Sequence, residues 1–256
     1  LRSVAKAEAF WLDLDSKHLY GVLLREVSWP TLNLDQLALG PVAEIFARVV
    51  DSVSQWTAVH AAGVAATAVA LAAKLHFAPR GLSAMRAAAY FHDLGKLTVP
   101  NVILDKAGKL TRGEFAIIRG HTYHTFRLLE TIGGLEEINE WASFHHERLD
   151  GTGYPFHHGG EHLTLGSRIM AVADTFTGMS EDRPYRAGMG RKQCLMLLEQ
   201  MSTCGALDGD VVAVLRREYD EIDTLRRQEQ ATYAEKQQRL AWFRTQKKRK
   251  SFYSST

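Results

Sequence analysis

An all-α fold is the class that this sequence of 256 residues predicts. Apolar residues recur at helical spacing through most of the chain, and no segment shows the alternation of a half-buried strand. Capping residues, glycines and prolines divide the chain into helices of ordinary length. Apolar residues make up 46% and charged residues 23%, which is usual for a soluble globular protein. The length allows one large domain, or one domain with appendages.

Composition excludes several classes of protein. A formal net charge of +2 gives no basic field for a nucleic acid polymer. Cys194 and Cys204 form no CxxC pair, which indicates a reducing compartment and argues against a zinc–thiolate site. The most apolar stretch, 56–73, is short for a membrane span and contains His60, so we expect no span. No signal peptide is visible, and we expect a cytoplasmic protein. Because the sequence begins with Leu1, we expect it to be a fragment.

Helix boundaries in the first third of the chain follow from glycine and proline. Helices are predicted over 5–14, 32–39, 42–53, 54–77 and 83–93. Gly40-Pro41 is expected to stop the second helix, and Pro79-Arg80-Gly81 the fourth. Ser83 is expected to cap the fifth. The apolar face of the helix over 42–53 is assigned to Ala43, Ile45, Phe46, Val49 and Val50.

The remaining two thirds continue in the same way. Helices are predicted over 111–120, 121–131, 135–147, 165–179, 191–202, 208–222 and 223–250. Thr111 and Glu114 fit a capping box at the start of the first of these. Residues 97–109 are expected to be irregular, and 150–160 to form tight turns because glycine and proline are dense there. The last segment is charged and rich in glutamine, which is typical of one long solvated helix.

Histidines and aspartates gather on these predicted core helices or at their ends. The set is His60, His92, Asp93, His121, His145, His146 and Asp174. Side chains on facing helices of a bundle can converge on one interior site. Burying such groups costs several kcal/mol unless they are paired or bound to metal. Seven nitrogen and oxygen donors exceed the needs of one tetrahedral zinc ion, and suit two ions with a bridging carboxylate.

The donor set also narrows the metal and the chemistry. Without a thiolate, iron or manganese is expected, although affinity alone would also accept zinc, nickel or cobalt. Two ions about 3.5–4 Å apart clamp an in-line displacement at phosphorus and generate hydroxide at neutral pH. The residues leave other interpretations open. His92 and Asp93 could form a structural ion pair, His60 could be a core histidine, and the set could be a hydrogen-bond network without metal.

Two stretches now point to a family. Residues 92–96 read His-Asp-Leu-Gly-Lys, and residues 145–155 begin with His-His-Glu and end with Gly-Tyr-Pro. Together they resemble the two signatures of the HD-GYP family, a subgroup of the HD phosphohydrolase superfamily. The similarity covers roughly residues 45–215. It continues through 103–106, Glu114, His121, 168–169, Asp174 and 183–186. A bare HD match would be weak, whereas this ordered set is specific.

The resemblance implies an HD-type helical bundle with a buried di-metal site over residues 42–222. A small helical segment or the remnant of a preceding domain would occupy 1–41, and a charged helix or tail 223–256. The implied activity is metal-dependent hydrolysis of cyclic di-GMP to pGpG, or onward to GMP, by a metal-bridging hydroxide. The seven donors match the family's metal ligands, with Asp93 as the bridge. Positions near the substrate are Lys96, which faces the scissile phosphate, Tyr154, Arg183 and Arg186.

Departures from the family pattern suggest alternatives. Some members bind a third metal through a glutamate four residues before the first histidine. Here Trp56 takes that place, so we expect two metals. Ala61 and Thr177 replace a serine and an aspartate that the family has beside the ligands. Loss of such a supporting group lowers metal affinity or activity about 10–100-fold. A second hypothesis is therefore a cyclic di-GMP receptor that signals through a protein partner with weak or no turnover. A third is a phosphohydrolase for another nucleotide, including a different cyclic dinucleotide.

Single residues near the motifs have structural interpretations as well. Lys96 could be a cation favoured at a helix end. Tyr154 could shape its loop, and Glu147 suits a structural partner better than a general base. The basic run 247–250 suits a solvated tail, with contact to an anionic membrane or a protein as the alternative. The remaining histidines near the site are expected to face solvent: His124, His157, His158 and His162.

Overall fold

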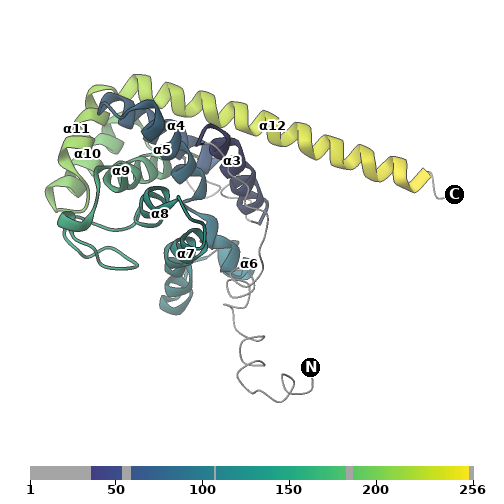
Figure 1. The fold of residues 1–256 in the computed structure, drawn as a ribbon, viewed down its shortest axis with the longest axis horizontal. Coiled ribbons are helices and arrows are strands. Elements are labelled where there is room, and N and C mark those ends of the chain that lie inside the picture. Colours follow the sequence, from purple (N-terminus) through teal and green to yellow (C-terminus); the bar gives the residue numbers. More distant parts are fainter. Residues whose placement is uncertain (1–35, 54–58, 107, 183–186, 254–256) are drawn as a thin grey trace, which may run out of the picture. The chain divides into compact units, whose positions relative to one another are not determined.

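The computed structural model describes residues 36–53, 59–106, 108–182 and 187–253. The chain divides into two units, Leu1–Asp35 and Gln36–Thr256. The first unit lies outside the described residues, as do the predictions made for it. In the second unit, every regular element of the described ranges is a helix (Figure 1). The predicted all-α class is therefore confirmed.

The described elements follow one another as helices joined by short turns. In chain order they are α3 (Gln36–Val53), α4 (His60–Lys74), α5 (Pro79–Phe91), the 3₁₀ helix η2 (Leu94–Thr98), α6 (Asn101–Leu104), α7 (Arg112–Glu130), α8 (Glu136–Ser143), the 3₁₀ helix η3 (Gly160–His162), α9 (Leu165–Ser180), α10 (Arg191–Thr203), α11 (Gly209–Arg217) and α12 (Tyr219–Tyr253). Within these described stretches, no helix combines the length and the apolar character that a membrane crossing requires.

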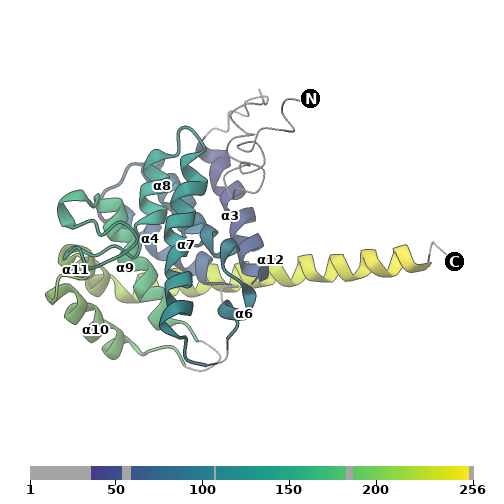
Figure 2. The same cartoon turned by 90° about the horizontal axis from the view of Figure 1, so that it is seen from below.

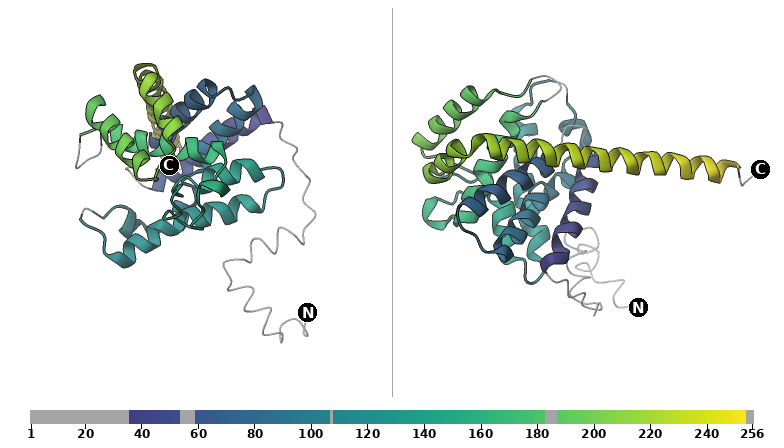
Figure 3. Two further views of the ribbon diagram at one scale, coloured as in Figure 1. Left: turned by 90° about the vertical axis from the view of Figure 1, so that its left-hand side faces the viewer. Right: turned by 90° about the horizontal axis from the view of Figure 1, so that it is seen from above.

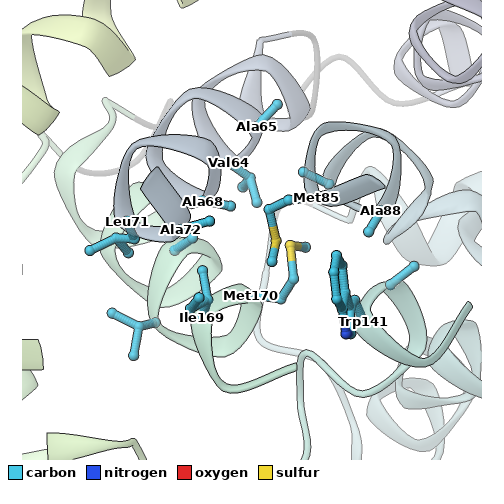
Figure 4. Packing of buried hydrophobic residues seen from close by; sticks show 14 of the residues in the cluster. Val64, Ala65, Ala68, Leu71, Ala72, Met85, Ala88, Trp141, Ile169 and Met170 are labelled. Atoms are coloured by element: carbon cyan, nitrogen blue, oxygen red, sulfur yellow. The ribbon is translucent and has the colours of Figure 1, made fainter. Parts of the chain in front are cut away.

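Four of these helices, α4, α5, α8 and α9, form the centre of the core. Figure 4 shows Met85 of α5 and Met170 of α9 meeting between the small residues of α4, with Trp141 of α8 beside them. All three side chains are buried. Alanines such as Ala65 and Ala68 let α4 approach its neighbours closely, and dense packing of this kind resists displacement. The core thus fixes the helix ends that carry the predicted ligands.

Helix α12 packs along α4 through its first half, and its second half continues beyond the other helices (Figures 2 and 3). Ile222 and Tyr233 are buried on the packed side, and the Tyr233 ring stacks on Tyr90 with centroids 6.5 Å apart. The prediction of a long C-terminal helix is right, but the helix begins at Tyr219. The prediction that it is wholly solvated is wrong, because its first half contributes one face to the core.

The predicted stop at Gly40-Pro41 is wrong, since α3 runs through Pro41. A proline inside a helix removes one backbone hydrogen bond, and packing can outweigh that loss. Ala43, Ala47 and Val50 form the buried stripe of α3, at the spacing i, i+4, i+7, and the helix packs on α5. The predicted apolar face was too broad. Its other members, Ile45, Phe46 and Val49, are exposed.

Two further boundaries differ from prediction for local reasons. Pro79 begins α5 instead of ending the preceding segment, because proline is favoured at the first helical position. Ser83 lies inside that helix and donates its hydroxyl to the Pro79 carbonyl at 3.2 Å. Helix α7 is continuous, so the predicted break at Gly120-His121 is also wrong. The predicted capping box of α7, between Thr111 and Glu114, is confirmed.

The other differences are small. Residues 97–109 are not wholly irregular, since they contain the end of η2 and the short helix α6. Helix α8 ends at Ser143, so the two histidines predicted on it lie in the turn that follows. A helix end before such a pair frees the backbone to aim both rings toward the interior.

Candidate metal centre

The structure brings the seven predicted ligands together, some from helix ends and others from the middle of a helix. His60 is the first residue of α4, and Asp174 lies on α9. His121 belongs to α7, while His92 and Asp93 occupy the junction of α5 and η2. His145 and His146 follow α8. Their ligand atoms form three groups within 4.8 Å: His121, His145 and His146; His60, His92 and Asp174; His92, Asp93 and His145.

Three of the histidines, His92, His121 and His145, share one orientation. Each places its Nδ1 within 2.6–2.7 Å of the backbone carbonyl three residues earlier. A carbonyl oxygen only accepts, so Nδ1 carries the proton and donates it. The other ring nitrogen, Nε2, is left with a bare lone pair. A backbone or carboxylate acceptor on the distal nitrogen is the usual arrangement for a histidine that binds metal.

These bare nitrogens face one another in a buried space. The Nε2 atoms of His121 and His145 lie 3.4 Å apart, and the Nε2 atom of His92 is buried with no hydrogen-bond partner. Burial lowers the pKa of His121 to about 3, and burial together with the neighbouring histidines holds the pKa of His145 well below its usual range. Both rings are therefore neutral. Converging lone pairs are costly unless a cation lies between them, so the donors fit divalent metal ions.

Asp93 faces two sides of this cluster. Its Oδ1 lies 3.4 Å from Nε2 of His121, and its Oδ2 lies 3.3 Å from Nε2 of His92. Burial alone would raise the pKa of Asp93, but His92 and Lys96 hold it well below the usual range. The Lys96 Nζ donates to Oδ2 at 2.6 Å. An ionised carboxylate with its two oxygens toward different histidines has the disposition of a bridging ligand.

His60 is held between two carboxylates. Its Nε2 lies 3.0 Å from Oδ1 of Asp174, and its Nδ1 lies 3.0 Å from Oε1 of Glu181. Burial would lower the pKa of His60, but Glu181 and Asp174 outweigh it and raise the pKa to about 10 in the metal-free protein. The second oxygen of Asp174 lies 3.8 Å from Nδ1 of His146, the ligand with the most exposed side chain. Asp174 thus lies between the first and last histidines of the set.

A cavity of about 230 Å³ opens beside these ligands. It is smaller than a typical site for a drug-sized ligand. The cavity can therefore enclose one phosphodiester, while larger parts of a ligand stay outside it. Its lining consists of His60, Asp93, Lys96, His146, Asp174, Thr175 and Gly178.

The loop after the double histidine lies next to the metal centre. Glu147 accepts the backbone N–H groups of Phe156 at 2.6 Å and His158 at 3.1 Å, which supports the structural role predicted for it. The Tyr154 ring lies 4.9 Å from the His146 ring. The Arg119 guanidinium also contacts this ring, 4.3 Å from its centroid. Tyr154 is therefore at the edge of the metal centre.

Several residues near the site were missed by sequence reasoning. Arg119 was overlooked because the helix was expected to break just after it. Glu181 follows Asp174 by seven residues, which is about two helical turns, and that spacing was the available signal. Nothing in the sequence marks Gln230. Arg183, Arg186 and Trp56 lie outside the described residues. Of the other histidines, His157 and His162 are exposed, while His124 and His158 are half-buried.

The two substituted neighbours of the ligands are both buried. Ala61 follows His60 in α4. The hydroxyl of Thr177 lies 3.4 Å from that of Thr67 on α4. This contact joins α9 to α4, whereas an aspartate at position 177 would bring a negative charge. The substitution thus makes the surroundings of Asp174 less acidic than the family pattern implies.

Comparison with known proteins defines the class. The family model described as HD domain matches residues 44–211. This chain belongs to the HD domain family, and the predicted family is confirmed.

Particular relatives are phosphodiesterases. The chain is 33% identical to 3′3′-cGAMP-specific phosphodiesterase 1 of Vibrio cholerae, over 85% of this chain and 51% of that protein. It is 35% identical to cyclic di-GMP phosphodiesterase PA4108 of Pseudomonas aeruginosa, over 55% of this chain and 34% of that protein. The chain thus spans about half the length, or less, of these curated relatives. The crystal structure of the cyclic GMP-AMP-specific phosphodiesterase V-cGAP3 of V. cholerae superimposes with a TM-score of 0.55 at 28% identity, covering 86% of this chain and 50% of that one.

Proposed function

We propose that this chain is a metal-dependent phosphodiesterase that hydrolyses a cyclic dinucleotide. Buried histidine Nε2 atoms that converge beside Asp93 carry the proposal. Cyclic di-GMP, with pGpG or GMP as product, is the first candidate substrate. Two V. cholerae relatives that are named as 3′3′-cGAMP-specific phosphodiesterases add 3′3′-cGAMP as the second candidate. We also propose a cytoplasmic location, which the two free cysteines support.

The proposed metal ligands are the seven residues named above. Two divalent ions, iron or manganese, would supply Lewis-acid polarisation of the phosphate and activation of water. Asp93 stays ionised at neutral pH and keeps the cluster charged to attract cations. Lys96 lines the cavity and is partly exposed, so its ammonium group can reach a phosphate oxygen without leaving Asp93. A fixed cation there stabilises negative charge that develops on the phosphate.

Substrate recognition is proposed for the residues around this cavity. Because the cavity is small compared with a cyclic dinucleotide, we expect much of the ligand to contact its rim. Tyr154 offers a ring for stacking, and Arg119 offers a guanidinium fork for a phosphate or a guanine edge. Arg183 and Arg186, which the family motif suggests, are proposed for the same role.

The direct test is a product assay with two substrates. Protein loaded anaerobically with Fe²⁺ or Mn²⁺ should convert cyclic di-GMP or 3′3′-cGAMP into a linear dinucleotide or mononucleotides, resolved by liquid chromatography. Asp93→Ala should abolish the product, because the cluster then loses its shared carboxylate. The ratio of kcat/KM for the two substrates assigns the specificity. Equal turnover by the wild-type and Asp93→Ala proteins would refute the proposal.

A receptor with little turnover is the second candidate, and the buried Thr177 favours it. A threonine bound to Thr67 brings no charge to the surroundings of Asp174. Tight binding of cyclic di-GMP by calorimetry, without product under iron or manganese, would identify the receptor and point to a protein partner. Hydrolysis within minutes would exclude it. A competition panel of other nucleotides separates both from a phosphohydrolase for another substrate.

A further inference from the structure

His60 differs from the other histidines in what holds its ring. His92, His121 and His145 each use the carbonyl three residues earlier. His60 is the first residue of α4. Its Nδ1 is instead 3.0 Å from a carboxylate oxygen of Glu181, at the C-terminal end of α9. The orientation of this ligand therefore depends on residues distant in the sequence.

Glu181 is itself held by helix α12. The carboxylate is buried, and its Oε2 accepts a hydrogen bond from Nε2 of Gln230 at 3.3 Å. The same amide nitrogen lies 3.3 Å from the Val59 carbonyl, directly before His60. On the other side, the Gln230 Oε1 accepts from Arg226 at 2.7 Å, and Asp223 holds Arg226 at 2.6 Å. A continuous chain of hydrogen bonds thus runs from α12 to His60.

The surface of α4 leaves room for this chain of hydrogen bonds. Gly63 lies one turn after His60, and a Cβ there would come within 2.6 Å of the Gln230 Nε2. The same Cβ would come within 2.8 Å of the Thr177 Cγ2. Real Cβ atoms do not approach other atoms so closely. The absence of a side chain at this one position lets the Gln230 amide reach between α4 and α9.

We infer that Glu181 and Gln230 are positioning residues of the metal centre, and that helix α12 belongs to the centre through them. Glu181 orients the His60 ring through Nδ1, so that Nε2 lies beside Asp174, and it strengthens Nε2 as a metal ligand, as carboxylates behind metal-bound histidines do. Gln230 fixes the Glu181 rotamer. The inference rests on the proposed metal centre and assigns the support of one of its ligands.

Metal binding tests the inference without any substrate. Chelator-treated wild-type, Glu181→Ala, Glu181→Gln and Gln230→Ala proteins are titrated with Co²⁺, followed by its visible absorption, and metal content is measured after dialysis. Glu181→Ala should weaken binding about 10–100-fold. Glu181→Gln keeps an acceptor oxygen for Nδ1 of His60, so its metal affinity should fall by less than about tenfold. The metal affinity of Gln230→Ala should fall between those of the wild-type and Glu181→Ala proteins. Gln228→Ala, an exposed glutamine two residues earlier on α12, is the control and should match the wild type.

The outcomes separate the inference from the proposed function. Wild-type affinity in Glu181→Ala would overturn the inference and leave the metal centre intact. A wild-type protein that binds no metal would overturn both. Thermal unfolding of the metal-free proteins shows whether each variant folds, and if Glu181→Ala does not, Glu181→Gln and Gln230→Ala decide. Equal metal affinity in those two and the wild type would then refute the inference.

Discussion

The contact that holds Nδ1 of each histidine decides which nitrogen faces the cluster. In His92, His121 and His145, Nδ1 donates a hydrogen bond to a backbone carbonyl. In His60 the partner of Nδ1 is the carboxylate of Glu181. Because these contacts orient the rings before any metal arrives, we expect little rotation of the rings on binding. Among the described residues that line the cavity, Lys96 is the one lysine or arginine. We therefore propose that metal binding and charge stabilisation are divided between different side chains.

Lys96→Met should separate these two tasks. The variant keeps all seven proposed ligands but loses the ammonium group beside Asp93. We expect kcat for the cyclic dinucleotide to fall roughly 10²–10³-fold, the usual loss when one preorganised donor is removed. Metal content should stay at the wild-type level. Single-turnover rates and metal analysis check this, with Lys192→Met, an exposed lysine on α10, as the control. Unchanged kcat would show that Lys96 is only a helix-end cation.

The residues that gather at the candidate site could be predicted at this scale, but the contacts that hold them could not. Histidine and aspartate at helix ends are visible in a sequence, and the family pattern adds the intervals between them. The His60–Glu181 contact joins residues 121 positions apart, and no local pattern encodes it. Arg119 on the Tyr154 ring is likewise a contact between two elements.

Helix α7 and the 3₁₀ helix η2 show how elements place the ligands. The Gly95 N–H donates to the Thr125 hydroxyl at 2.9 Å, and that hydroxyl donates to the His92 carbonyl at 3.1 Å. A Cβ at Gly95 would collide with the backbone carbonyl of His121. The glycine therefore permits backbone contact between the element that carries His92 and Asp93 and the helix that carries His121.

Gly95→Ala should disturb both stability and metal binding. The collision involves backbone atoms of α7, which cannot rotate away as a flexible side chain would. Overpacking of this kind typically costs about 1–3 kcal/mol. We expect a loss of that size in denaturant unfolding, together with weaker metal binding. Gly113→Ala is the matched control, because a Cβ there meets nothing within 4 Å and alanine favours the helix. Equal effects of the two substitutions would contradict the steric explanation.

Errors in element boundaries have the same origin as these contacts. The sequence placed a break at Gly120, but His121, Thr122 and Thr125 are buried on the continuous helix α7. Tertiary packing outweighs the weak helix propensity of one glycine. The capping box at Thr111 was predictable because both of its partners lie within one turn.

At the scale of the whole unit, the metal centre joins helices from distant parts of the chain. The contact between His60 and Asp174 spans 114 positions, and that between Val59 and Gln230 spans 171. The all-α class was predictable because it follows from local periodicity. The burial of the first half of α12 was not, since its sequence is strongly charged and its mean apolar character is low. The buried face of such a charged helix can be identified only when the helices that pack against it are known.

Metal should therefore stabilise the folded unit as a whole. Each ion that binds only the folded state at about 100 times its Kd adds roughly 2.7 kcal/mol to the free energy of unfolding. For a domain of this size that corresponds to a rise in Tm of roughly 5–10 °C. Calorimetry of chelator-treated protein, before and after Mn²⁺ is restored, measures the shift. Asp93→Ala should show a much smaller one, and an equal shift in both proteins would contradict a shared di-metal site.

The position of Gln230 also sets an order of events during synthesis. Ribosomes release the N-terminal part of a chain first, and domains begin to fold as they emerge. When Asp174 has been added, all seven proposed ligands are present, but the glutamine inferred to steady Glu181 is still 56 residues from being added. On this inference, a polypeptide that ends before Gln230 should hold its cations loosely. Tight loading with metal would then await the translation of α12.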